Sequence, residues 1–131
     1  MNLDKLLKKV EKNALNKDKQ EVKKLIIGDD EFEVLTMTRK EKCDFIYSRK
    51  ATQSEMNVGE LVKWAKPFIY RSLQLKDLAI KAIDAGYIQK YHDIVDYLFE
   101  PTEVLEIIAF ITEINNIAGT QEEEIEEIKK Q

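Results

Sequence analysis

The first helical pattern in the chain lies in residues 2–16. Apolar side chains recur there at the spacing that places them on one face of a helix, at Leu3, Leu6, Leu7 and Val10. Lysines are frequent among the remaining positions, so we expect a basic amphipathic helical arm over residues 1–21. Its apolar face would pack on the rest of the protein, or the helix would fray. The alternative is that the arm binds a membrane surface or an acidic partner.

Residues 22–37 predict a β-hairpin. Residues 22–27 are rich in β-branched and aliphatic side chains, Gly28, Asp29 and Asp30 give a turn signal, and residues 31–37 begin with polar–apolar alternation. Because an isolated hairpin is marginal in water, it must pack on helices or pair with another chain. No proline protects its edges, so strand addition between subunits is one route to a homo-oligomer.

Helical patterns follow from residue 38 onwards. Thr38 and Glu41 have the spacing of a capping box, at the start of a helix that we expect to end near Arg49. Ser54 is expected to cap the next helix, and Pro67 is expected to kink that helix or split it.

Three further helices are predicted, over residues 76–85, 87–99 and 101–118. Gly86 is expected to end the first of them, Pro101 to begin the last, and Gly119 to end it. Together these patterns predict one mainly α (α+β) domain over residues 22–119, with the small hairpin packed on a bundle of five to six helices. Residues 120–131 are Glu-rich and are expected to form a disordered acidic tail.

The helix over residues 101–117 is apolar around much more than a third of its circumference. Such a helix is central in a core, or it also faces a second chain or another partner. Our hypothesis for a client or subunit surface comprises Leu98, Ile107, Phe110, Ile111 and Ile114. Trp64, between two lysines, is a further candidate that either anchors a partner or fills the core.

Composition and charge argue against several kinds of binding site. The 131 residues are 35% charged, with a net charge of −4, which argues against a dedicated nucleic-acid binder. Tyr87, Tyr91 and Tyr97 could stack on bases, but acidic neighbours would repel phosphate, so we expect them to pack in the core with hydroxyls reaching solvent. A single cysteine excludes an internal disulfide and a Cys-rich zinc site.

No catalytic motif is found. The sequence has no glycine-rich phosphate loop and no nucleophile elbow, and nothing in the spacing brings Cys43 and His92 together. His92, Asp96 and Glu100 follow one another at intervals of four, which is usually solvated charge rather than a metal site. We therefore expect a non-enzymatic protein without cofactor or metal, and, since no signal peptide or membrane span is recognised, a cytoplasmic one.

Three phrases carry a resemblance: EVLTMTRKEKCDFI at residues 33–46, LFEPTEVLEII at residues 98–108 and INNIAG at residues 114–119. In this order, after a short hairpin, the chain resembles the tail assembly chaperones of long-tailed bacteriophages and prophages, in particular those of Gram-positive hosts. The resemblance covers roughly residues 22–119 and does not include the basic helix at residues 1–16.

The resemblance implies a small, mostly helical, non-enzymatic protein in the cytoplasm of the bacterial host. Such a chaperone binds the long tape measure protein and keeps it soluble before the tail tube polymerises around it. Chaperones of this family are often made in two forms, the longer one by a translational frameshift near the end of the shorter. Residues 120–131 would lie close to that junction.

Two other functions fit the same patterns. One is a small cytoplasmic adaptor or regulatory protein that binds another protein through its apolar helices, for which the basic arm would be needed. The other, less favoured, is a DNA-binding regulator, which would require a basic recognition helix. The candidates at residues 76–85 and 87–99 are acidic instead.

Overall fold

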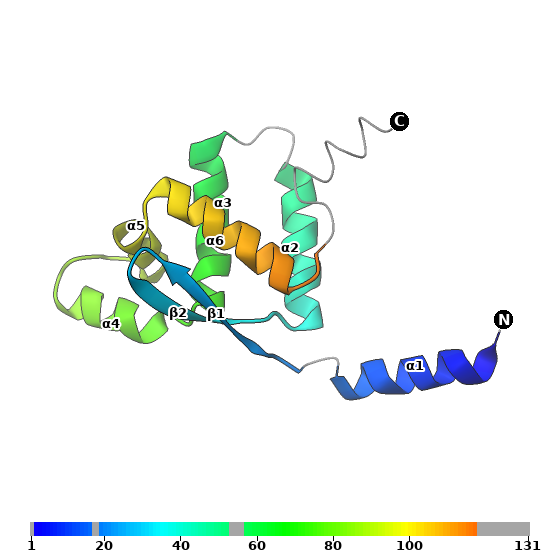
Figure 1. Ribbon diagram of the computed structural model, residues 1–131. Coiled ribbons are helices and arrows are strands. Elements are labelled where there is room, and N and C mark those ends of the chain that lie inside the picture. The colour runs from blue at the N-terminus through cyan, green and yellow to red at the C-terminus, as the bar shows by residue number, and fades with distance from the viewer. Residues whose placement is uncertain (1, 17–18, 53–56, 118–131) are drawn as a thin grey trace.

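The computed structural model describes residues 2–16, 19–52 and 57–117, with the backbone alone for residues 50–52. The expected mainly α fold with an N-terminal hairpin is confirmed (Figure 1). Its elements, in chain order, are α1 (Leu3–Asn16), β1 (Val22–Ile27), β2 (Asp30–Leu35), α2 (Arg39–Thr52), α3 (Val58–Ser72), α4 (Lys76–Asp84), the 3-10 turn η1 (Tyr91–Asp93), α5 (Ile94–Leu98) and α6 (Pro101–Ile114).

The hairpin forms because its turn and its apolar positions agree. β1 and β2 pair antiparallel from Val22 opposite Leu35 to Ile27 opposite Asp30. Gly28 takes a φ of 62° in the turn, a conformation that glycine adopts without steric cost. Ile27 and Val34 face inward and are buried, whereas Val22 and Ile26 are exposed. One face of the hairpin therefore covers the core, and its outer face carries two exposed β-branched side chains.

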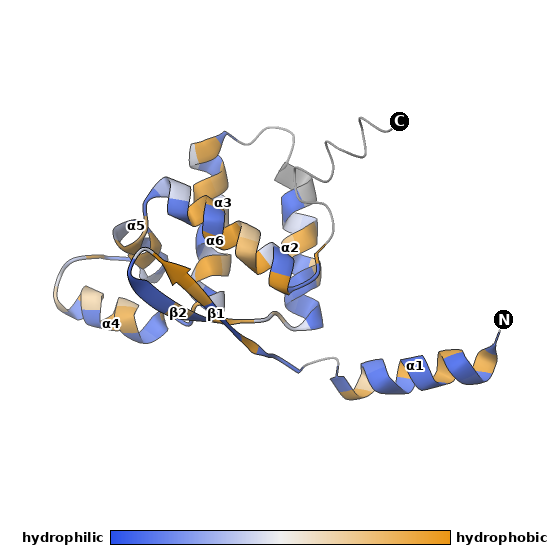
Figure 2. Ribbon diagram, viewed as in Figure 1, coloured by the Kyte–Doolittle hydropathy of each residue, from blue (hydrophilic) through white to orange (hydrophobic). Residues whose placement is uncertain are grey.

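Helix α6 is the centre of the domain. It packs against α3 and also contacts β1, which places it between the helical body and the hairpin (Figures 1 and 2). Phe32 of the hairpin meets Phe99, just before α6, edge to face at 5.2 Å between ring centroids. The core side chains buried to 1% exposure or less are Val34, Phe45, Ala65, Ile69, Ala79, Val95, Val104, Ile107 and Ile111.

Three helices end in the same way. In α4, Gly86 has a φ of 80°, its N–H donates to Ile83 O, and the N–H of Tyr87 donates to Ala82 O at 2.9 Å. This pair of bonds is a Schellman motif, and it confirms Gly86 as the residue that ends the helix. In α3 and α6 the left-handed residue is Gln74 and Asn116 instead, each with a φ of 54°.

The end of α6 therefore differs from the expectation. Asn116 turns the chain after Ile114, so the helix ends before Gly119, which lies outside the described residues. An asparagine side chain tolerates the left-handed conformation better than most residues, so no glycine is needed there.

Other boundaries differ too. The Thr38–Glu41 capping box is confirmed, with N–H···O distances of 3.2 and 3.3 Å, but α2 runs on to Thr52 rather than ending near Arg49. The cap of α3 is Asn57, whose Oδ1 accepts the Glu60 N–H at 2.9 Å. Ser54, the expected cap, lies outside the described residues.

Pro67 does not split α3, which continues through it from Val58 to Ser72. The ring removes one N–H from the helix ladder, but the face that includes Ala65 and Ile69 is fully buried against the core. That burial holds the helix together across the proline.

The expected helix over residues 87–99 is wrong in its first half. The chain has no helix between Tyr87 and Lys90, and only η1 and the short α5 follow. The Schellman end at Gly86 turns the backbone out of the helix path. Tyr87 and Tyr97 are more than 70% exposed and Tyr91 is also exposed, so the expected core packing of these rings is wrong.

Candidate functional site

The apolar residues predicted to contact a partner fall into two groups. Ile107 and Ile111 are fully buried in the core, which corrects the expectation for these two. Leu98, Phe110 and Ile114 pack against the core but remain partly exposed. Only the second group offers surface to a partner. Periodicity alone could not separate the groups, because α6 is apolar on most of its circumference.

Trp64 joins α2 to α3 as part of the core. Its ring lies 5.1 Å from Phe45 and 5.2 Å from Phe68 between centroids, and its indole N–H donates to the hydroxyl of Ser48. Both ends of the side chain are thus used inside the domain. Of the two interpretations left open for Trp64, the contacts favour the filling of the core over the anchoring of a partner.

The arm carries an uncovered apolar face. Helix α1 forms as expected, but its apolar side chains do not pack on the body: Leu3, Leu7 and Val10 are each more than 60% exposed and Leu6 is 42% exposed. The helix extends away from the domain (Figures 1 and 2). The stripe of Leu3, Leu6, Leu7 and Val10, here called the leucine stripe, is therefore available to another surface.

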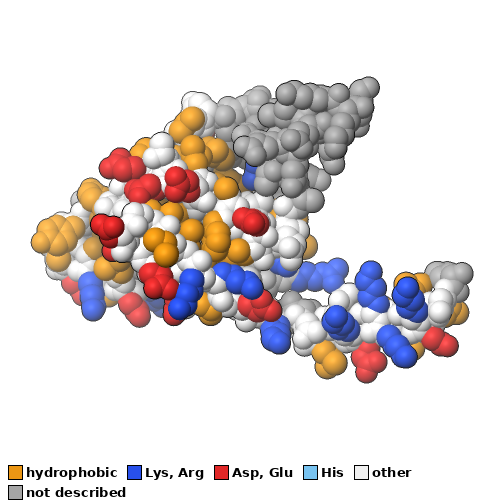
Figure 3. All heavy atoms as spheres, in the orientation of Figure 1, with side chains coloured by type: hydrophobic (Ala, Val, Ile, Leu, Met, Phe, Trp, Pro, Cys, Tyr) orange, Lys and Arg blue, Asp and Glu red, His pale blue; other side chains and the backbone are white. Residues whose placement is uncertain are grey.

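Lysines lie mainly on the other side of α1 and meet the leucine stripe at its Leu6 edge. Leu6 lines a shallow hollow together with Lys5, Lys8, Lys9 and Lys12, and lysine side chains are prominent on the side of the arm that Figure 3 shows. The arm thus carries an apolar face and a basic face that adjoin at Leu6.

A second hollow lies where the arm joins the domain. Its volume is about 340 Å³, and it is lined by the end of the arm, the end of the hairpin and the end of α6. The lining residues include Asn16, Lys19, Met37, Ile114 and Asn116. The N-terminal arm and the segment that follows α6 thus leave the domain at the same place.

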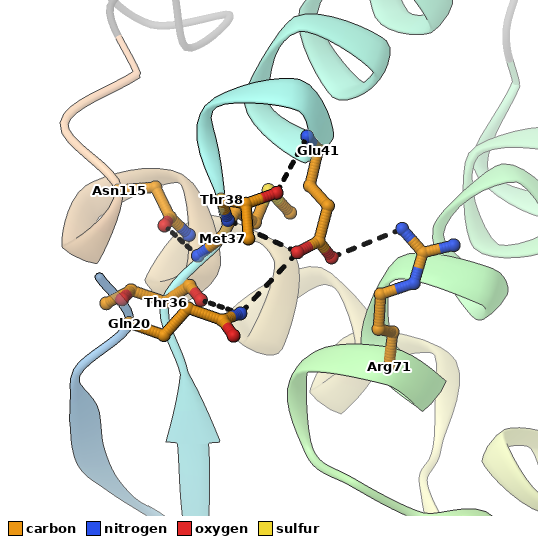
Figure 4. Close-up of polar contacts among 7 residues, drawn as sticks. All are labelled: Gln20, Thr36, Met37, Thr38, Glu41, Arg71 and Asn115. Atoms are coloured by element: carbon orange, nitrogen blue, oxygen red, sulfur yellow. Dashed lines mark hydrogen bonds and ion pairs between the residues drawn. The ribbon is translucent and has the colours of Figure 1, made fainter. Parts of the chain in front are cut away.

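Buried polar contacts fix this junction (Figure 4). Asn115 is 2% exposed, its Oδ1 accepts the N–H of Met37 at 2.7 Å, and its Nδ2 donates to Ile111 O at 2.8 Å. The amide of Gln20 donates to Thr36 O at 2.8 Å. These bonds attach the start of the hairpin and the end of α6 to one rigid point.

Glu41 extends the same network to α3. Its carboxylate accepts from Gln20, from the Thr38 N–H and from the guanidinium of Arg71 at 3.2 Å. One side chain thus completes the cap of α2 and connects that helix to the hairpin and to α3. Sequence reasoning identified the cap but had no signal for the other partners.

A charged cluster lies at the middle of α3. Lys66 pairs with Asp96 and, at 3.6 Å, with Asp93. Burial lowers the pKa of Lys66, but the hydrogen bonds and charges of Asp96 and Asp93 outweigh burial and leave the pKa above its ordinary value. Both aspartates pair with the lysine, and no described contact joins Asp96 to His92.

The rings of Tyr70 and His92 contact each other beside this cluster, with centroids 4.7 Å apart and an angle of 57° between the ring planes. Burial, with the nearby Tyr91 and Asp77, raises the pKa of the Tyr70 hydroxyl. A hollow of about 480 Å³ is lined in part by Tyr91, His92 and Asp93.

Other chemistry is not assembled in the described part of the chain. No group of three or more His, Cys, Asp or Glu side chains could hold a metal ion among the residues that the structure describes. Cys43 is exposed on α2. Within the same residues, none of the helices has the length and apolar character to cross a bilayer.

Comparison of the chain with protein-family models, with curated proteins and with solved structures found no match.

Proposed function

We propose that this protein is a phage or prophage tail assembly chaperone, which binds the tape measure protein and keeps it soluble before tail tube polymerisation. The observation that carries the proposal is the uncovered leucine stripe on α1. A protein that holds an apolar helical client in solution needs an apolar strip on an otherwise charged body. The order of hairpin, capped helix and apolar closing helix is consistent with the resemblance described above.

The client would lie along the arm as a helix. Four aliphatic side chains over about two turns can pack against one apolar face of a long helical protein. The partly exposed Leu98, Phe110 and Ile114 offer a second apolar contact on the body. In this proposal the protein is non-enzymatic and acts in the cytoplasm of the bacterial host.

The first experiment is to sequence the DNA downstream of the gene. We expect an overlapping second reading frame followed by a very long gene for a mostly helical protein. That protein is then co-expressed with this one, and its soluble fraction is measured. A neighbourhood without any long helical gene would contradict the tail chaperone proposal and leave the adaptor alternative, for which a partner would be sought by pull-down.

Two variants locate the client surface. Leu6→Gln with Leu7→Gln removes apolar side chains from the stripe and keeps the charge and the helix propensity. Lys8→Gln with Lys12→Gln is the matched control on the basic side of the same helix. We expect the first pair to lose the soluble client and the second to retain it. None of these side chains is buried in the domain, so neither pair should unfold the protein. Retention by both pairs would contradict the assignment of the client to the arm.

A further inference from the structure

The leucine stripe has a candidate occupant in the chain itself. The last described residue, Ile117, follows Asn116, which lines the hollow at the base of the arm together with Asn16 and Lys19. The fourteen residues after it, 118–131, therefore begin beside the end of α1. Helix α1 also has fourteen residues. Residues 118–131 would span about 21 Å as a helix and at most about 50 Å when extended, so they can reach the whole arm.

The charges of the two segments are opposite. Helix α1 carries four Lys against Asp4 and Glu11, a net charge of 4 − 2 = +2. Residues 118–131 carry five Glu and two Lys, a net charge of 2 − 5 = −3. At physiological ionic strength such charges attract one another over about 8 Å.

The apolar positions of the two segments also match. Between residues 121 and 131 the only apolar side chains are Ile125 and Ile128, spaced three apart and flanked by glutamates. This spacing would place both on one side of a helix. When the segment runs back along α1 from the end of α6, Ile125 comes level with Val10 and Ile128 comes level with Leu7. The glutamates then come level with the part of α1 that carries the lysines.

We propose that residues 118–131 bind along α1 of the same chain, with Ile125 and Ile128 on the leucine stripe. The stripe is thereby covered by an acidic amphipathic segment while the protein is free. The pairing concerns this chain alone and does not depend on the proposed client. A client would have to displace the segment, so its binding would be weaker with residues 118–131 present than without them.

Disulfide trapping in the full chain tests the pairing. The background variant is Cys43→Ser, which removes the natural thiol. The test chain carries Val10→Cys, Lys12→Gln and Ile125→Cys. The control chain carries Lys12→Cys and Ile125→Cys, so that the new thiol lies at nearly the same height on the opposite face of α1. Both chains have the same net charge. The rate of disulfide formation within one chain is measured in dilute solution with a mild oxidant.

We expect the test chain to form its internal disulfide about tenfold faster than the control, because docking raises the effective concentration of one thiol at the other. High salt should bring the two rates together. Equal rates at low salt would overturn the proposal. Disulfides formed between two chains, and not within one, would also overturn it, since the occupant of the stripe would then be a second copy. Neither result would bear on whether the protein holds a client.

Discussion

The Oδ1 of Asn115 accepts a hydrogen bond from the backbone N–H of Met37 at 2.7 Å, and these two residues are 78 positions apart in the sequence. Both are buried, at 2% and 6% exposure. The bond closes the domain by joining the residue after α6 to the segment between the hairpin and α2. A buried N–H without a partner is costly, so this contact is important for the stability of the fold.

Asn115→Ala is expected to lower the free energy of unfolding by about 1–3 kcal/mol, because it leaves the Met37 N–H buried without an acceptor. Urea unfolding followed by circular dichroism measures the change. Glu113→Gln, at an exposed position two residues earlier, is the control and should unfold like the parent protein. A parent-like midpoint for Asn115→Ala would mean that water or another group replaces the lost acceptor.

Gly86→Ala is expected to destabilise the protein by about 1 kcal/mol or somewhat more, because a φ of 80° strains any residue with a Cβ. No atom lies within 4 Å of the added methyl group, so the cost comes from the backbone alone. Gly59→Ala in the first turn of α3 is the matched control. It should be neutral or stabilising, since alanine favours helix and the new Cβ meets Asn57 Oδ1 at an ordinary 3.4 Å. Thermal unfolding of the two variants gives the comparison, and an equal effect of both would refute the argument.

Asp96→Asn removes a charged partner of Lys66 and should lower the free energy of unfolding by up to about 1 kcal/mol at neutral pH. The effect is small because Asp96 is 42% exposed and water screens the pair. The pKa of Lys66 is raised above 10.5 in the folded protein. A lysine whose pKa is raised by folding stabilises the protein fully at pH values below its pKa in the unfolded chain. This stabilisation is lost as the pH rises through its pKa in the folded protein. The difference between Asp96→Asn and the parent should therefore shrink as the pH rises above 10.5 and through the folded pKa of Lys66.

Denaturant titrations at neutral and alkaline pH measure that difference. Glu106→Gln removes the same charge from an exposed position on α6 and serves as the control. A difference that stayed constant across the alkaline range would show that Asp96 acts through contacts other than the lysine.

Phe110→Asp is expected to abolish client binding and to leave the helical content unchanged, because Phe110 is partly exposed on α6. Ala109→Asp, at the exposed neighbouring position, adds the same charge and should keep the client soluble. Circular dichroism and co-expression with the client give the two readouts. Loss of the helical signal in Phe110→Asp alone would show that this ring serves the core rather than a partner.

Local signals predicted the parts of the fold that depend on neighbouring residues. The capping box at Thr38 and Glu41, the turn at Gly28 and the helix end at Gly86 each need only a few adjacent side chains, and all three are confirmed. Gln74 and Asn116 end their helices with the same backbone geometry, but neither carries the glycine by which such an end is recognised. The end of α6 was therefore placed too late.

Burial was harder to predict than secondary structure. Ile107 and Phe110 belong to one apolar helix, yet the first is fully buried and the second is partly exposed, because only tertiary packing decides which side of α6 meets α3. The leucine stripe has the pattern of a core-facing helix, but in the described structure it faces no core. The amide of Asn115 had no sequence signal at all, since its partner is a backbone N–H far along the chain.

The bond between Met37 and Asn115 also has a consequence for synthesis. At the usual 5–20 residues per second, about 4–16 s pass between the addition of one residue to the growing chain and that of the other. The hairpin is synthesised early, but the residues that cover its inner face, from Phe99 to Asn115, are synthesised much later. Any nascent chain therefore has an interval in which its first strands are complete and still without their core.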